Sequence, residues 1–340
     1  EYLLVKLNAR YEERPLPQVS IVDLREELKK GNRSVLSLEL KRDLEQVLER
    51  REQAMLFLNR RGYAGFVSCR ACGHVMKCPH CDVSLSEHNG NRLICHYCGY
   101  ETVKPEICPS CGSPHIGGFK AGTQQIEKVI EKEFPKARVL RMDFDTTSKK
   151  GSHEKIIKSF ADGEYDILLG TQMVAKGLDF PNVTLVGVIN ADTSLNIPDF
   201  RSSEVTFQLL CQVAGRSGRG EKEGKVIIQT FNPDHYAIRY AKNHDYIGFF
   251  TQEMSIRRKL GYPPYYYLTV LRIMSKSYDD AKEVSGKVAV YLEKNLPNTI
   301  LLGPSIASVF RINNIYRFQK NTKFQFFPLL RADLQRSAQY

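Results

Sequence analysis

The sequence predicts an α/β protein whose parallel sheet is covered by helices on both faces, with a metal-binding insertion and a small α+β domain after it. Short, continuously apolar runs alternate with segments of helical periodicity, a pattern typical of parallel strands that are buried on both faces. Eight of the nine cysteines interrupt this alternation as four Cys-x-x-Cys pairs between Cys69 and Cys111. Beyond residue 245 the pattern changes to a basic helix, a Pro-Pro turn and a strand.

Three predicted elements precede the cysteine pairs. Residues 19–24 form an apolar run that predicts a short strand, and residues 34–49 place their leucines on one stripe, as an amphipathic helix does. Residues 54–58 are again continuously apolar and predict a second strand. We therefore interpret residues 1–30 as a linker and the start of the α/β domain, which continues through residues 31–68.

The same alternation resumes after the cysteines, so the α/β domain is expected to continue over residues 112–244. Gly122 and Thr123 precede a helix with an apolar stripe. The other predicted elements are strands at 139–142, 166–169, 183–189 and 226–230 and helices at 153–160 and 204–213. The last unit, residues 245–340, is expected to hold a basic helix, a strand at 267–274, a second helix and a short strand at 300–302, as in a small α+β domain.

The four Cys-x-x-Cys pairs predict two structural zinc sites within residues 69–111. Each pair is a turn that directs two thiolates at one point, and two such turns complete a tetrahedral site. Four cysteine ligands leave no open position, so neither zinc ion is expected to be catalytic. The pairs are Cys69/Cys72, Cys78/Cys81, Cys95/Cys98 and Cys108/Cys111.

The spacing of the pairs favours a nested arrangement, in which the two inner pairs share one zinc ion and the two outer pairs share the other. Five residues separate Cys72 from Cys78, which is short for one pair to fold back on the next, whereas thirteen separate Cys81 from Cys95. A cross-braced pairing stays open. Five nearby histidines are alternative ligands, although hydrogen-bonded or exposed histidines are favoured: His74, His80, His88, His96 and His115.

Composition restricts the compartment and the partners. The formal net charge of +11 becomes about +7 when eight zinc-bound thiolates and two zinc ions are counted. Nucleic acid is therefore an expected partner, with mere solubility as the alternative explanation of the charge. Because no signal peptide or membrane span is recognisable and the cysteines do not form a secreted disulfide framework, we expect a cytoplasmic monomer without a membrane partner.

The segment from Gln212 to Arg219, which we call the arginine segment, carries the strongest catalytic signal. It reads QVAGRSGR and places two arginines three apart on a glycine-rich turn after a predicted helix. Guanidinium groups stay charged and can bind a phosphate with two donors. Taken alone, the segment is also compatible with a loop whose arginines are only solvated.

A second segment, residues 170–181, reads GTQMVAKGLDFP. It follows a predicted strand, so we expect it at the carboxyl end of the sheet, where α/β folds bind ligands. Together with the arginine segment it resembles motifs V and VI of superfamily 2 helicases, and Gly122-Thr123-Gln124 resembles their motif IV region. The NRRG stretch before the cysteines, the cysteine pairs and the GYPP turn extend the resemblance to the bacterial primosomal replication-restart helicases, over roughly residues 1–319.

This resemblance implies a fold and a set of nucleotide contacts. The α/β domain would be the second RecA-like lobe of an ATP-dependent 3′-to-5′ DNA helicase. Arg216 and Arg219 would reach across a cleft to ATP held by another lobe, and Gln212 would order that cleft. Gly177 and Asp179 would couple the state of the nucleotide to the interface between the lobes.

The resemblance also implies DNA contacts and protein partners. Thr123, Gln124 and Thr171 would bind phosphates of single-stranded DNA. In this family the zinc module serves duplex unwinding and contacts within the primosome, and the C-terminal domain binds branched DNA and the single-stranded-DNA-binding protein. The candidates for such contacts, for which strand packing and a solvated helix are equal alternatives, are Tyr265, Tyr266, Tyr267, Arg257 and Arg258.

Two departures from the family pattern limit what this chain does alone. The chain has no G-x-x-x-x-G-K-[ST] phosphate loop, which in this family belongs to an N-terminal lobe together with the acidic motif that binds magnesium. We therefore expect ATP and Mg²⁺ to bind only in a full-length enzyme, and the 340-residue chain to hydrolyse almost no ATP. The tail, residues 320–340, does not continue the family's pattern.

Two other classes of protein remain as alternatives. The first is a non-enzymatic adaptor that binds DNA or protein through its zinc ribbon on a degenerate α/β scaffold. The second is a zinc-ribbon part of a transcription or translation factor, which the three helicase-like segments disfavour. Restored ATP hydrolysis on addition of an N-terminal lobe would separate the helicase hypothesis from the adaptor.

Overall fold

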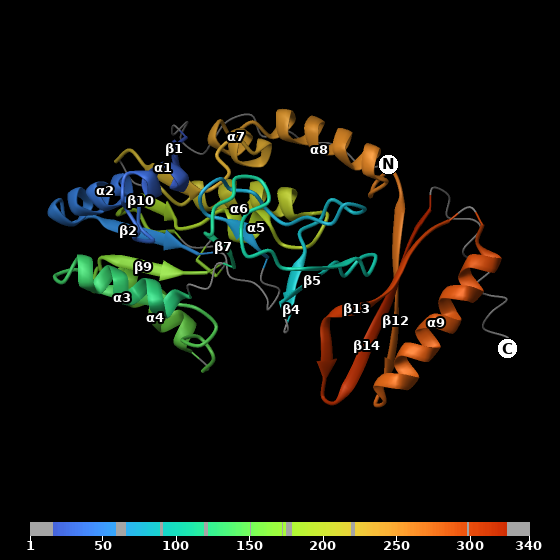
Figure 1. Ribbon diagram of the computed structural model, residues 1–340. Helices are drawn as coiled ribbons and strands as arrows, with labels where there is room; N and C mark the ends of the chain where they lie inside the picture. The colour runs from blue at the N-terminus through green and yellow to red at the C-terminus, as the bar shows by residue number, and fades with distance from the viewer. Residues whose placement is uncertain are drawn as a thin grey trace, which may run out of the picture. The chain divides into compact units, whose positions relative to one another are not determined.

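The structure of the chain, a computed structural model, describes residues 16–58, 66–88, 91–118, 122–149, 151–171, 173–174, 179–218, 222–297 and 299–324. The chain divides into two units, whose elements are labelled in Figure 1. The first unit consists of Glu1–Arg61, Lys120–Leu195 and Val205–Asp245. The second consists of Gly62–Phe119, Asn196–Glu204 and Tyr246–Tyr340.

The first unit is built on a sheet of six described strands in the order β1-β11-β10-β2-β9-β8, and every neighbouring pair is parallel. β2, β9 and β10 are buried along their whole length, as their continuous apolar runs predicted. The predicted fold class is confirmed. The strands are β1 (Gln18–Asp23), β2 (Gln53–Phe57), β8 (Val139–Met142), β9 (Ile167–Gly170), β10 (Val183–Val188) and β11 (Lys225–Thr230).

Helices pack against this sheet through apolar stripes. α2 packs on β2 and β10, α3 and α4 pack on β8, and α7 packs on β1. Gly187 in β10 allows the close approach of α2, because a Cβ atom there would lie 2.9 Å from a methyl carbon of Leu40. The helices up to residue 245 are α1 (Leu24–Lys29), α2 (Leu38–Glu49), α3 (Thr123–Glu133), α4 (Ser152–Ala161), α5 (Asp192–Leu195), α6 (Ser202–Ala214) and α7 (Tyr236–Lys242).

Within the second unit, the cysteine-rich segment forms two small antiparallel sheets. β3 pairs with β7, and β5 lies between β4 and β6. Val67, Val83, Leu85 and Leu93 form its small apolar core together with the inner cysteines. The strands are β3 (Ser68–Cys69), β4 (Ser86–His88), β5 (Arg92–Ile94), β6 (Glu101–Val103) and β7 (Ile116–Gly117).

The C-terminal part of the second unit is an antiparallel sheet in the order β12-β14-β13, with α9 packed against all three strands (Figure 1). α8 precedes the sheet and ends at the predicted basic residues. No helix among the described residues has the length and apolar character needed to cross a membrane. The elements are α8 (Tyr246–Leu260), β12 (Tyr267–Ser275), α9 (Tyr278–Asn295), β13 (Ile300–Ile312) and β14 (Ile315–Phe324).

The hairpin of β13 and β14 corrects two expectations. The predicted strand at 300–302 is too short, because β13 runs on to Ile312. Asn313 and Asn314 have φ angles of 49° and 61°, so they form the two-residue left-handed turn that favours asparagine. The expectation that the tail departs from the family at residue 320 is wrong for the described residues, because β14 continues to Phe324 as the central strand.

Candidate functional site

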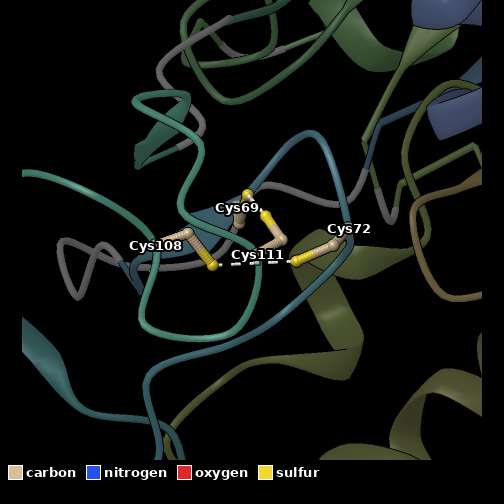
Figure 2. A group of neighbouring side chains, drawn as sticks. All are labelled: Cys69, Cys72, Cys108 and Cys111. Carbon is tan, nitrogen blue, oxygen red and sulfur yellow. Dashed lines mark hydrogen bonds between the residues drawn. The ribbon is translucent and has the colours of Figure 1, made fainter.

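The outer cysteines converge on one point from the two ends of the insertion, as Figure 2 shows. The Sγ atoms of Cys69 and Cys111 lie 3.7 Å apart, as do those of Cys72 and Cys108. Four sulfurs at about 2.3 Å from a tetrahedral zinc ion would be separated by about 3.8 Å. The pairing of β3 with β7 explains the convergence, because it brings the chain after Cys111 back beside Cys69.

The inner cysteines form a second group of the same size. All four Sγ atoms lie within 4.8 Å of one another, and those of Cys78 and Cys98 are 3.6 Å apart. The arrangement is therefore nested, not cross-braced, and among the described residues neither group includes a histidine nitrogen. The inner group consists of Cys78, Cys81, Cys95 and Cys98.

Each Cys-x-x-Cys pair is held by the same backbone turn. The residue after each pair has a positive φ, and its N–H donates to the carbonyl of the first cysteine at 2.8–3.1 Å. Three of these four residues are glycine, which adopts positive φ without strain. The fourth is Asp82, with a φ of 51°. These residues are Gly73, Asp82, Gly99 and Gly112.

The electrostatics of the inner group suit a bound cation. Burial raises the pKa of Cys78 to about 12, whereas a hydrogen bond with Cys81 lowers the pKa of Cys95 to about 5. Four crowded thiols therefore cannot all ionise by themselves. A soft divalent cation removes this conflict, because it binds thiolates and compensates their charge. The two groups of four cysteines thus fit two structural zinc ions.

Side chains of the C-terminal sheet bind the backbone between the inner zinc ligands. The amide of Asn321 donates to the carbonyl of Tyr97 at 2.7 Å. The hydroxyl of Ser305 donates to the carbonyl of His96 at 2.9 Å, and the His96 ring lies 2.9 Å from the carbonyl of Ile306. The loop between Cys95 and Cys98 is therefore part of the support of β13 and β14.

An aromatic cluster lies beside the other inner pair. The ring of Tyr262 stacks on that of Phe200 with centroids 4.8 Å apart and an angle of 5°. Lys323 Nζ lies 3.7 Å from the centre of the Tyr262 ring. Arg257, a sequence candidate for DNA contact, lies over Phe200 at 5.1 Å and is only 7% exposed. Arg257 thus serves packing, whereas Arg258 is exposed over the ring of Tyr265.

The three predicted DNA contacts come together at the carboxyl edge of β8 and β9. Thr171 directly follows β9, and its N–H donates to the carbonyl of Met142 at 3.3 Å. Thr123 begins α3, and its hydroxyl donates to Asp143, just after β8, at 2.7 Å. Gln124 follows it and is exposed. The hydroxyl of Thr123 is therefore engaged by Asp143, and its backbone N–H belongs to the first turn of α3, where N–H groups have no acceptor within the helix.

The arginine segment lies at the opposite, amino edge of the same sheet. Ser217 Oγ donates to the carbonyl of Thr184 at 2.8 Å, and Gly218 N donates to that of Val183 at 3.3 Å. Both carbonyls belong to the start of β10. Of residues 170–181, which we expected at the carboxyl end, Gly170 and Thr171 do lie there, whereas Phe180 and Pro181 lie just before the start of β10.

The other predicted nucleotide contacts are only partly described. Arg216 is half-buried after the end of α6, and its N–H donates to the carbonyl of Val213. Gln212 is exposed one turn earlier on the same helix, and Asp179 is exposed before β10. Gly177 and Arg219 lie outside the described residues.

Sequence matches agree with this architecture. The family model "Helicase conserved C-terminal domain" matches residues 117–221, and "PriA DNA helicase Cys-rich region (CRR) domain" matches residues 78–102. "Primosomal protein N C-terminal domain" matches residues 258–339, so the expected departure of the tail is wrong for the sequence as well. The chain is thus a RecA-like C-terminal helicase lobe with a zinc-binding module and a small C-terminal domain.

Curated relatives show the family. The chain is 54% identical over 326 residues to Replication restart protein PriA of Bacillus subtilis, covering 95% of this chain and 40% of the relative. It is 46% identical over 341 residues to that of Synechocystis, covering 98% of this chain and 41% of the relative. The chain belongs to the PriA replication restart family and matches its C-terminal half. It spans about two fifths of the length of these relatives.

Solved structures with a partly similar fold include S. cerevisiae Dbp5 bound to RNA and ADP BeF3, with 12% identity and a TM-score of 0.35. That match covers 72% of this chain and 45% of Dbp5. RecG bound to a three-way DNA junction has 15% identity and a TM-score of 0.33, covering 73% of this chain and 26% of RecG. The family assignment rests on the sequence matches.

Proposed function

We propose that this chain is the second motor lobe, zinc module and C-terminal domain of an ATP-dependent 3′-to-5′ DNA helicase that acts in replication restart. One observation carries the proposal. The arginine segment lies at the amino edge of the parallel sheet, where Ser217 binds the start of β10, and the candidate DNA-binding residue Thr171 lies at the carboxyl edge, directly after β9.

At the amino edge, Arg216 supplies positive charge for a nucleotide held by another lobe. The segment that carries it is fixed by Ser217, which is fully buried. Such an arginine stabilises the charge that develops on the transferred phosphoryl group, without taking part in bond formation. ATP with Mg²⁺ would supply the free energy of the cycle, and Asp179, which precedes β10, would accept a hydrogen bond from a ribose hydroxyl.

At the carboxyl edge, the start of α3 and the end of β9 suit the backbone of single-stranded DNA. The first N–H groups of a helix have no partner within the helix and carry a partial positive charge. Thr123 and Gln124 would therefore bind phosphates through these N–H groups, and Thr171 would do so through its hydroxyl, which gives affinity without sequence preference. A nucleotide-dependent movement of this edge relative to another lobe would move DNA.

The rest of the chain supplies binding surfaces. We infer that the zinc module and the C-terminal domain bind branched DNA, the single-stranded-DNA-binding protein and other primosome proteins, as the family resemblance implies. The adaptor hypothesis is not favoured, because the helicase family model covers both the motif IV and the motif VI regions.

ATP hydrolysis with and without single-stranded DNA tests the proposal. The full-length protein is expected to show DNA-stimulated turnover, whereas the 340-residue chain alone is expected to show almost none. Robust hydrolysis by the 340-residue chain, or none by the full-length protein, would contradict the proposal. Arg239 is an exposed arginine on α7. Arg239→Ala in the full-length protein is a control for loss of an arginine and is expected to leave turnover unchanged.

A further inference from the structure

Glu52 is a buried carboxylate at the amino edge of the first unit that belongs to none of the helicase-like segments. It directly precedes β2, and the residue is 5% exposed. Its Oε2 accepts a hydrogen bond from Thr184 Oγ1 at 2.7 Å and from Arg50 Nε at 3.1 Å. Its Oε1 lies 3.0 Å from Lys222 Nζ. Both carboxylate oxygens are thus engaged.

The partners of Glu52 bracket the arginine segment. On one side, the Thr184 residue that donates to Glu52 also accepts from Ser217, through its carbonyl, at 2.8 Å. On the other side, Lys222 resumes the described chain after the segment. Ser217 directly follows Arg216, so Glu52 is linked to the backbone of that arginine through two residues, Thr184 and Ser217.

The chain after Arg216 is closely packed where it leads back into the sheet at β11. Gly218 has a φ of +67°, and a Cβ atom there would lie 2.7 Å from the backbone nitrogen of Gly224. Ser217 Oγ also lies 3.2 Å from the carbonyl of Lys225, the first residue of β11. Residues 217 and 218 therefore pack closely against the backbone of residues 224 and 225, which leads into β11.

Glu52 is charged in this environment. Burial by itself would raise the pKa of Glu52, but hydrogen bonds from Thr184, Lys222 and Arg50 outweigh it and hold the pKa below 4.5. The buried hydroxyl of Thr184 is the fixed donor to this carboxylate, whereas the side chains of Lys222 and Arg50 are 55% and 54% exposed. Two of the donors flank the arginine segment: Thr184 binds Ser217, and Lys222 follows the segment in the chain. A charge network that serves stability alone would not require this placement.

We propose that Glu52 is a positioning residue, which holds the arginine segment so that Arg216 meets the nucleotide phosphates. The proposal rests on the proposed function of Arg216 and adds a residue through which that function is set. Misplacement of a charged group by about 1 Å can lower turnover by orders of magnitude. Loss of Glu52 should therefore lower kcat, because it displaces Arg216.

A double-mutant cycle in the full-length protein tests this proposal. Arg216→Ala, Glu52→Ala and the double variant are compared by the kcat of DNA-stimulated ATP hydrolysis, with thermal unfolding as a check on the fold. We expect kcat to fall about a thousandfold for Arg216→Ala and about tenfold for Glu52→Ala. The double variant is expected to match Arg216→Ala alone, since residues that act through one another are not additive.

Two further variants sharpen the comparison. Glu52→Gln keeps an acceptor for Thr184 and is expected to fold and to lower kcat by only about threefold; it takes the place of Glu52→Ala in the cycle if that variant does not fold. Asp166→Asn is the matched control. Asp166 pairs with Arg138 at 2.6 Å directly before β9, at the same edge, and its loss is expected to leave kcat unchanged.

The outcomes separate the two proposals. If the Glu52 substitution lowers kcat by the same factor in the wild-type and Arg216→Ala backgrounds, the positioning role is overturned and the proposed function stands. An unchanged kcat in Glu52→Ala, or in the Glu52→Gln variant that replaces it, would also overturn positioning alone. An unchanged kcat in Arg216→Ala would overturn the proposed function and the positioning role together.

Discussion

The phenol of Tyr262 donates a 2.9 Å hydrogen bond to the backbone carbonyl of Cys81, a cysteine of the inner zinc site. Tyr262 lies in the turn after α8 and is 3% exposed. The bond joins residues 181 positions apart in sequence. The inner zinc site is therefore built into the second unit by contacts from both the turn after α8 and the C-terminal sheet.

Removing this hydroxyl should weaken the unit without dismantling it. Tyr262→Phe keeps the stack on Phe200 but leaves a buried carbonyl without its donor, which costs about 1–2 kcal/mol. We expect a lower denaturant midpoint for the chain and faster release of one zinc ion to a chelator. Tyr291→Phe, at an exposed position on α9, is the control. Equal stability of the two variants would refute the structural role of the bond.

Loss of the two zinc ions should have different consequences. Metal analysis should find two zinc ions per chain, and Cys95→Ser should leave one. Because His96 and Tyr97 accept hydrogen bonds from Ser305 and Asn321, hydrogen exchange should then accelerate in β13 and β14. The sheet of the first unit should keep its protection.

An outer-site variant is the matched comparison. Cys108→Ser should also leave one zinc ion, but the turn around Cys108 is held by local bonds such as that from Cys108 N to the carbonyl of Ser113. Exchange should therefore accelerate within residues 66–88 and 108–117 more than in β14. Identical exchange patterns for the two variants would contradict separate roles for the sites.

Substitutions at Thr123 can separate its hydroxyl from its backbone. Thr123→Val removes the bond to Asp143 and should lower stability, with affinity for single-stranded DNA unchanged. Thr123→Pro also removes the N–H, and proline is tolerated at the first position of a helix, after the extended backbone of Gly122. Full-length protein with this variant should bind DNA about tenfold more weakly than with Thr123→Val, as measured by fluorescence anisotropy. Equal affinities would exclude a phosphate contact by this N–H.

The stabilising effect of Asp143 should depend on pH. Burial would raise the pKa of Asp143, but hydrogen bonds from Thr123 and Thr146 hold it below 3.8. A carboxyl with a depressed pKa in the folded state stabilises the fold above its unfolded pKa, and this contribution is lost as pH falls through the folded value.

Asp143→Asn should therefore destabilise the first unit by about 1–2 kcal/mol at pH 7. The difference from the wild type should stay constant down to about pH 5 and shrink below about pH 4. Urea-dependent hydrogen exchange of β8 is the measurement, with the exposed Asp145→Asn as control. A difference that grows on acidification would show that the sign is wrong.

Local patterns explain how much the sequence could predict. Continuous apolar runs identified β2, β9 and β10, because parallel strands that are buried on both faces consist almost entirely of apolar residues. The cysteine spacing likewise indicated the nested arrangement that the structure shows. Both predictions depend on residues that are close in sequence.

The parts that sequence reasoning missed depend on distant residues. Glu52 and Thr184 are 132 positions apart, and Asn321 and Tyr97 are 224 apart, so neither contact leaves a periodic signal. The hairpin at Asn313 did leave one, since two asparagines between alternating residues favour a left-handed turn. The amino-edge position of the arginine segment required the direction of each strand crossover, which composition does not encode.

The most direct test of a motor lobe is the kcat of DNA-stimulated ATP hydrolysis by full-length protein carrying Arg216→Ala. Arginine residues that stabilise a phosphoryl-transfer transition state contribute at least about a thousandfold to turnover. We expect a loss of that size, with zinc content and single-stranded DNA binding unchanged. Turnover equal to that of the wild type would contradict the assignment of this lobe to ATP hydrolysis.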